Sequence, residues 1–179
     1  MGFPAAYPYN GQRDMILGGK GANGMEEQKR FTLRQAGAED LAQLAKLFNE
    51  YRVYYGQASD VEAGAAFLAE RLERKESVVF LALTPEGEAA GFTQLYPSFS
   101  SVSARRLWIL NDLYVGEAYR GAGAATQLMR EAENFARVTG AKGLTLTTRK
   151  DNLTAQRLYE GLGYVREETF YTYDFDFES

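Results

Sequence analysis

Hydrophobic residues recur at helical spacing in some stretches of the chain and form unbroken or alternating runs in others. Spacings of three and four residues predict amphipathic helices at about 39–55, 61–72, 125–136 and 152–161. Unbroken or alternating apolar runs predict strands at 31–35, 78–83, 89–96, 107–115, 142–148 and 163–166. The last residues also alternate, with Tyr171, Tyr173, Phe175 and Phe177 on one side, so we expect a further strand there.

The predicted order of elements is β-α-α-β-β-β-α-β-α-β-β, which indicates an α/β domain around a mixed sheet. We see no internal repeat, and we expect residues 25–179 to form a single domain. Residues 1–24 hold six Gly and two Pro without any periodic pattern. We interpret this segment as a flexible leader, derived from a vector or lying upstream of a natural start at Met25; a flexible native arm is the alternative.

Composition excludes several kinds of chemistry, because the chain contains neither cysteine nor histidine. A cysteine nucleophile, a Ser-His-Asp triad and an imidazole base are therefore absent, as are zinc sites made of thiolates or imidazoles. The net charge of −4 argues against nucleic acid or an anionic membrane as the main partner. With no membrane span or secretory signal in the sequence, we expect a cytoplasmic protein.

A short segment rich in Gly and Ala separates the strand at 107–115 from the next helix. It reads Arg120-Gly121-Ala122-Gly123-Ala124-Ala125-Thr126. Small residues at a helix N-terminus leave backbone N–H groups uncovered, and these donors together with the helix dipole suit a pyrophosphate. Arg120 can add a charged contact. The alternative is a tight turn that uses small residues for packing. The segment matches neither a Walker loop nor a complete dinucleotide fingerprint.

A second motif follows the next predicted strand, running from Asn152 through Leu158-Tyr159 to Gly163-Tyr164. The pattern Arg-x-x-Gly-x-Ala, then a helix and a strand, then Asn-x-x-Ala-x-x-Leu-Tyr-x-x-x-Gly-Tyr resembles the GNAT superfamily of acyl-CoA-dependent N-acetyltransferases. The resemblance covers about residues 31–177. It implies a GNAT-like α/β fold with a mixed, mostly antiparallel central sheet that is splayed at the acyl-CoA site and flanked by about four helices.

The resemblance also implies where acetyl-CoA, the acyl donor co-substrate, would bind. The backbone of Leu113, Tyr114 and Val115 would pair with the pantetheine arm, and the segment Arg120–Thr126 would surround the pyrophosphate. Asn152 matches a residue that contacts the pantetheine arm, although it also suits the cap of the last helix. No metal is implied.

Catalysis in such an enzyme is direct attack of an amine on the thioester with both substrates bound. Tyr159 matches the tyrosine near the CoA sulfur and would protonate the thiolate; it could instead pack on the sheet. Asp112 is our candidate base, directly or through a water. It shares strand parity with Trp108, Leu110 and Tyr114, so the alternative is a carboxylate that satisfies a buried neighbour.

Two aromatic segments are expected to border the acceptor amine, one at the end of the first helix and one after the strand at 89–96. Tyr54, Tyr96 and Phe99 are the candidates for contacting it, whereas Tyr51 and Tyr55 fit core positions of the helix equally well. The residues at 97–103 are predicted as a loop.

The expected partner is a small-molecule or peptide amine. The alternating C-terminal strand could also pair across a homodimer. Two other functions remain open: a non-catalytic acyl-CoA-binding regulatory domain, and a structural interaction module.

Overall fold

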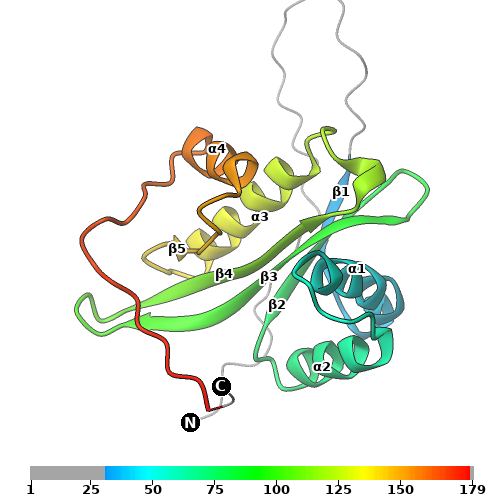
Figure 1. Cartoon of the computed structure of the whole chain (residues 1–179), viewed down its shortest axis with the longest axis horizontal. Coiled ribbons are helices and arrows are strands. Elements are labelled where there is room, and N and C mark those ends of the chain that lie inside the picture. Colours follow the sequence, from blue (N-terminus) through cyan, green and yellow to red (C-terminus); the bar gives the residue numbers. More distant parts are fainter. Residues whose placement is uncertain (1–30, 178–179) are drawn as a thin grey trace, which may run out of the picture. The chain divides into compact units, whose positions relative to one another are not determined.

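Five strands form one sheet in the computed structural model, which describes residues 31–177 (Figure 1). Their spatial order is β1-β2-β3-β4-β5. The strands are β1 (Thr32–Gln35), β2 (Val78–Leu83), β3 (Ala89–Ser100), β4 (Arg105–Val115) and β5 (Leu144–Thr145). The first four pair antiparallel, and β5 runs parallel to β4. This mixed, mostly antiparallel sheet confirms the fold class expected from the sequence.

The described residues form two compact units, one ending at Leu146 and the other beginning at Thr147. The first unit holds the sheet and three α-helices, which are α1 (Leu41–Tyr54), α2 (Val61–Glu73) and α3 (Ala124–Val138). The second unit holds α4 (Leu153–Gly161). Among residues 31–177 there are therefore four α-helices, as expected, and none of them is long and apolar enough to cross a membrane.

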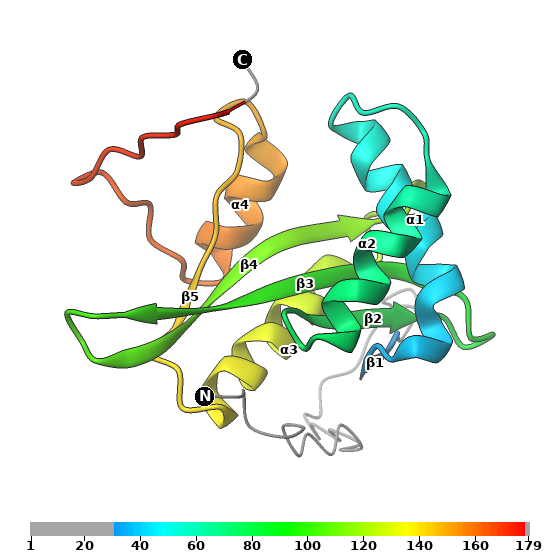
Figure 2. The same ribbon diagram turned by 90° about the horizontal axis from the view of Figure 1, so that it is seen from below.

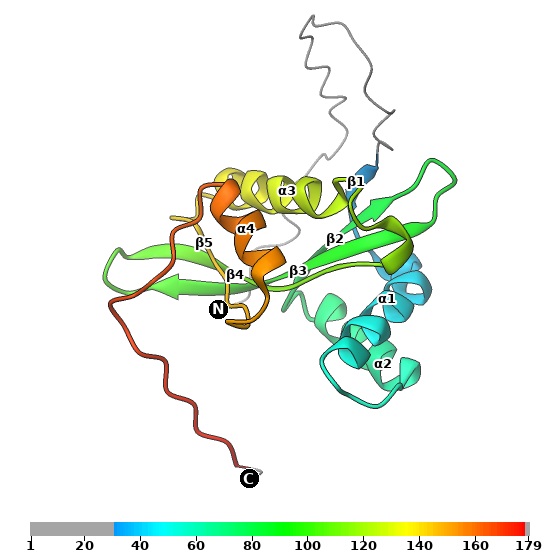
Figure 3. The same cartoon turned by 45° about the horizontal axis from the view of Figure 1, so that its top comes forward.

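Helices cover both faces of the sheet in the first unit, with α1 and α2 on one side and α3 on the other (Figure 3). Phe48 of α1 packs against Phe92 of β3 with ring centroids 6.2 Å apart. On the opposite face, Phe135 of α3 packs against Phe80 of β2 at 5.4 Å. Because β2 is buried on both faces, its sequence is an unbroken apolar run rather than an alternating one.

The hairpin of β3 and β4 is the longest pairing in the sheet (Figure 2), and it contains a β-bulge at Asn111. Gln94 pairs with Asp112, but the next residue, Leu95, pairs with Leu110, so Asn111 has no opposite residue. A bulge reverses the alternation of side chains along a strand.

The bulge corrects the expectation that Asp112 shares a face with Trp108 and Leu110. Trp108 packs against Phe135 of α3, with ring centroids 5.0 Å apart. Tyr114, six residues further along, packs against Tyr51 of α1 at 6.2 Å. Asp112 lies on the same side as Tyr114, because it accepts a hydrogen bond from Tyr51.

The loop predicted at 97–103 is shorter than expected, because β3 continues through Pro97 to Ser100. Pro97 pairs with Trp108 of β4, while the pairing of β2 with β3 ends at Leu95. Pro97 therefore lies beyond the end of β2, where its missing N–H breaks no ladder between these two strands.

Several elements predicted after residue 140 differ from the structure. The strand predicted at 142–148 is reduced to Leu144–Thr145. Neither the strand predicted at 163–166 nor the alternating one after Phe170 is formed within the described residues, and the alternating aromatic side chains are exposed. A strand needs a hydrogen-bonded neighbour, which alternation alone does not supply. Dimerisation through this segment stays a prediction, and the predicted leader at 1–24 lies outside the described residues.

Candidate functional site

Asp112 is a buried carboxylate held by amide donors from the two strands of the hairpin. Asp112 is only 3% exposed to solvent. Gln94 Nε2 donates to Oδ2 at 2.7 Å, and Asn111 Nδ2 donates to Oδ1 at 3.0 Å. The hydroxyl of Thr93 fixes the strand beneath by donating to the backbone carbonyl of Asp112 at 2.9 Å. The side chains of these consecutive residues, Asn111 and Asp112, contact each other at the bulge, which is the local reason for this arrangement.

Burial dominates the electrostatics of the cluster. It raises the pKa of Asp112 above its ordinary value of 3.8, although hydrogen bonds from Gln94, Tyr51 and Asn111 act in the opposite direction. Tyr96 joins the cluster because its hydroxyl accepts a hydrogen bond from Gln94 Nε2 at 3.1 Å. Burial, followed by the negative charge of Asp112, raises the pKa of Tyr96 to about 12. The arrangement can accept a proton at Asp112 while Tyr96 keeps its own.

The segment between β4 and α3 leaves backbone donors uncovered, as the sequence predicts. Gly123 is the N-cap of α3 at φ 85°, Gly121 has φ 76°, and no side chain caps the helix. A Cβ at Gly121 would meet nothing within 4 Å, and one at Gly123 would meet only Gln127 Nε2 at 3.9 Å. The glycines therefore keep the space over the helix N-terminus free, where the first N–H groups lack intrahelical acceptors. This cradle fits an anionic phosphate group.

Arg120 lies at the entrance to this segment and binds the end of β4. Its Nε donates to the carbonyl of Val115 at 3.2 Å, and its guanidinium lies 5.8 Å from the ring centroid of Tyr114. The hydroxyl of Tyr114 donates to Glu50 of α1 at 3.3 Å. Burial and then the charge of Glu50 raise the pKa of Tyr114. Arg120 thus brings a positive charge to the end of β4, at the start of the segment that leads to α3.

The second half of β4 has one unpaired edge within the first unit. Strand β5 pairs with β4 only at Trp108 and Ile109. From Leu110 to Val115, β4 therefore has β3 on one side and, within the described residues 31–146, no strand on the other. This is the opening of the sheet expected at Leu113, Tyr114 and Val115, where backbone groups can pair with an extended ligand.

Tyr159 and Asn152 belong to the second unit and are described within it. Asn152 caps α4, since its Oδ1 accepts a hydrogen bond from the N–H of Ala155 at 3.2 Å. Tyr159 is half-buried in the last turns of α4, with its ring centroid 6.1 Å from that of Tyr164. The capping role of Asn152 is thus confirmed, and the catalytic role of Tyr159 stays a prediction.

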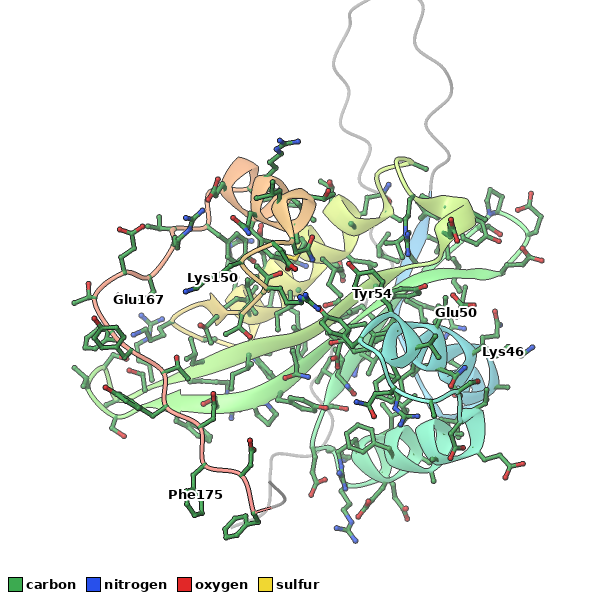
Figure 4. The ribbon with its side chains drawn as sticks, viewed as in Figure 1. Lys46, Glu50, Tyr54, Lys150, Glu167 and Phe175 are labelled. Atoms are coloured by element: carbon green, nitrogen blue, oxygen red, sulfur yellow. The ribbon has the colours of Figure 1, made fainter. Side chains whose placement is uncertain are left out.

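The three candidates for contacting the acceptor lie in different places. Tyr96 is part of the Asp112 cluster. Tyr54 is exposed on the last turn of α1, in a solvent-facing row with Lys46 and Glu50 (Figure 4). Phe99 is 63% exposed under the guanidinium of Arg106, five residues beyond Gln94 on β3. At about 3.4 Å per residue it lies about 17 Å along the strand from Gln94, away from Asp112.

Sequence reasoning missed Gln94 and left Tyr51 undecided between a core residue and part of the acceptor wall. Both contact Asp112. The sequence does contain a signal for Gln94, since it is a polar residue inside an apolar strand. The amide is fully buried and therefore requires hydrogen-bond partners.

A cavity of about 570 Å³ lies elsewhere in the first unit, where α2 meets the start of β2. Ala36, Leu41, Leu72, Ser77, Pro97 and Trp108 are among its lining residues. None of the site residues predicted from the sequence lines this cavity. We therefore place the candidate site at the Asp112 cluster, on the basis of its chemistry, and not at the cavity.

Comparisons with known proteins point to one family. Residues 41–164 match the model of the acetyltransferase (GNAT) family. The chain is 49% identical over 141 residues to an uncharacterized N-acetyltransferase, YhfO, of Bacillus subtilis (strain 168), covering 79% of this chain and 94% of that protein. It is 32% identical over 135 residues to a streptothricin acetyltransferase of Streptomyces lavendulae, covering 75% and 63%. A solved structure of a probable acetyltransferase has a TM-score of 0.78 and 44% identity, covering 82% of this chain and 98% of that one.

Proposed function

Because the chain belongs to the acetyltransferase (GNAT) family and is therefore an acyltransferase, we propose that it moves an acetyl group from acetyl-CoA to a primary amine. Both substrates would bind together, and the amine would attack the thioester directly. A C–N bond forms, the C–S bond breaks, and the amine proton passes to the protein. No covalent enzyme intermediate is needed, which suits a chain without cysteine or histidine.

The proposed donor site lies along the open edge of β4 and over the N-terminus of α3. Acetyl-CoA would supply the activated acyl group. The backbone of Leu113, Tyr114 and Val115 would bind its extended arm, and Asn152 is proposed as a further contact to that arm. The segment Arg120–Thr126 would bind the pyrophosphate through uncapped N–H groups, with the charge of Arg120 assisting. The free space at Gly121 and Gly123 supports this assignment.

The observation that carries the proposal is the buried Asp112 carboxylate beside this open edge. An acceptor amine is mostly protonated at neutral pH, so the enzyme needs a group that takes up a proton. Burial raises the pKa of Asp112 toward the range in which a carboxylate is an effective base. Since Asp112 is 3% exposed, the proton reaches it through a water molecule or a polar side chain in contact with it.

The leaving thiolate also needs a proton donor, and we assign this role to Tyr159. A phenol is a suitable general acid for a thiolate because its pKa is close to, and slightly above, that of a thiol. An N–H group at the bulge around Asn111 can stabilise the charge that develops on the carbonyl oxygen.

The acceptor is proposed to be a cationic amine that approaches from the side of α1. Tyr54 presents exposed aromatic surface on α1, the half-buried Tyr96 lies in the Asp112 cluster, and Glu50 adds a negative charge. The similarity to a streptothricin acetyltransferase favours small, basic acceptors in this proposal.

The direct test is amine-dependent release of CoA from acetyl-CoA, measured with a thiol reagent. The panel should contain polyamines, amino acids, aminoglycosides, streptothricin and peptides with free amino groups. The protein adds no thiol background, because it lacks cysteine. We expect release that depends on a primary amine. Binding of acetyl-CoA without release across the panel would instead favour the alternative, a non-catalytic acyl-CoA-binding regulatory domain.

A further inference from the structure

Two amides hold Asp112, and they differ in burial. Gln94 is completely buried on β3, whereas Asn111 is exposed at the bulge of β4. Gln94 Nε2 contacts Oδ2 at 2.7 Å, and Asn111 Nδ2 contacts Oδ1 at 3.0 Å. The exposed Asn111 can exchange its hydrogen bond to Oδ1 for one to water. The buried Gln94 cannot exchange its hydrogen bond to Oδ2 in this way.

The orientation of the Gln94 amide is costly unless it serves Asp112. Its Oε1 is buried and has no hydrogen-bond partner. An unsatisfied buried acceptor lowers the stability of the folded state. The same orientation directs Nε2 to both Asp112 and Tyr96. A carboxylate only accepts hydrogen bonds, so the ionised form of Asp112 requires the nitrogen and not the oxygen of this amide to face it.

We propose that Gln94 is a positioning residue for proton transfer: its buried amide holds Oδ2 of Asp112 and thereby leaves Oδ1 as the oxygen that takes the proton. Asn111 is the exchangeable partner, which releases Oδ1 when the proton arrives from the acceptor amine. The N–H bond of the amine breaks and an O–H bond forms at Oδ1, so one proton is transferred. This inference rests on the proposed role of Asp112 as the proton acceptor.

The other groups around the carboxylate fit this assignment. Tyr51 of α1 donates a hydrogen bond to Asp112, and Tyr96 of β3 reaches it through Gln94. Arg71 of α2 acts electrostatically on Tyr96 and is itself paired with Glu70 and Glu76. Because the pKa of Tyr96 is raised to about 12, its hydroxyl is neutral at physiological pH and brings no competing charge to Gln94.

The test compares the removal of each amide, with Gln94→Met and Asn111→Ala. Loss of a hydrogen bond to a charged group costs about 1.5–3 kcal/mol, equivalent to about one to two pH units. We expect Gln94→Met to move the acidic limb of the pH–rate profile upward by that amount and to lower kcat at its plateau by about tenfold. Asn111→Ala should move the limb less and lower the plateau less than Gln94→Met does, because water replaces the exposed donor.

A titration of Asp112 that does not depend on activity separates this inference from the proposed function. The carboxyl carbon of Asp112, labelled with ¹³C and assigned by its loss in Asp112→Asn, reports the pKa directly. Gln94→Glu is the isosteric second variant if Gln94→Met does not fold, and its added negative charge should raise this pKa further.

Equal effects of the Gln94 and Asn111 variants, or an unchanged Asp112 titration in Gln94→Met, would overturn the inference. If Asp112→Asn keeps full activity while Gln94→Met still shifts the titration, the proposed base fails and the hydrogen-bonding role of Gln94 survives.

Discussion

Trp108 and Asp112 lie four residues apart on one strand, yet their side chains face opposite sides of the sheet. Trp108 Nε1 donates to Thr139 at the end of α3 at 2.9 Å, whereas Asp112 accepts a hydrogen bond from Tyr51 of α1. The extra residue at Asn111 causes this reversal. It places the carboxylate on the side of α1 and α2, together with Tyr96 and Tyr114, and this placement is the basis of the predictions below.

Asp112→Asn should lower kcat by about 10²-fold or more, the usual effect of removing a general base. It should also change how stability depends on pH. Because burial raises the pKa of Asp112, the folded state binds this proton more tightly than the unfolded state does. Wild-type stability therefore falls as the pH rises from about 3.8 through the raised pKa. Asp112→Asn has no carboxyl group to titrate at this position. The melting temperature of the variant should therefore rise relative to that of the wild type as the pH increases through this range.

Tyr51→Phe should shift the acidic limb of the pH–rate profile upward while it leaves the fold intact. The hydroxyl of Tyr51 lowers the pKa of Asp112 by donating to it, so its loss raises that pKa and protonates the base at a higher pH. The ring keeps its packing against Phe92, 6.1 Å away between centroids. Tyr55→Phe is the control, because Tyr55 is exposed and is not among the groups that shift the pKa of Asp112; a similar shift in both variants would argue against the hydrogen bond from Tyr51 as the cause.

Gly123→Val should weaken acetyl-CoA binding by at least tenfold, measured by isothermal titration calorimetry. The valine side chain would fill the free space over the N-terminus of α3. Because Gly123 has φ 85°, the substitution also adds backbone strain. Gly140→Val controls for this strain: Gly140 follows the other end of α3, has φ 69°, and a Cβ there meets nothing within 4 Å. It should destabilise the protein and leave acetyl-CoA affinity unchanged; equal affinities for all three proteins would exclude the pyrophosphate assignment.

Tyr159→Phe should reduce turnover by about 10²-fold and preserve acetyl-CoA binding, because only the hydroxyl that protonates the thiolate is lost. Single-turnover kinetics with a tight acceptor would locate the defect in the chemical step. Tyr164→Phe, which alters the ring neighbour on the same unit, serves as the matched control. Full turnover in Tyr159→Phe would remove this residue from the mechanism.

The periodicity of the chain determined most of the fold. It placed α1, α2, α3 and α4 within a few residues of their bounds, and it predicted β2 with its observed bounds, Val78–Leu83. These elements are specified locally, because each one has an apolar face or run that packing must bury. The Arg-x-x-Gly-x-Ala motif and the Asn-x-x-Ala-x-x-Leu-Tyr-x-x-x-Gly-Tyr motif, at their spacing, likewise indicated the family.

Tertiary structure alone decided the environment of the candidate base. No local pattern marks the bulge at Asn111, because it arises from the register between two strands. The same register brings Gln94 to Asp112, a pair 18 residues apart in sequence. The sequence over-predicts strands near the C-terminus, because alternation shows only which residues could face a core. A strand also needs a neighbouring strand to pair with, and the sequence of the segment itself does not contain that information.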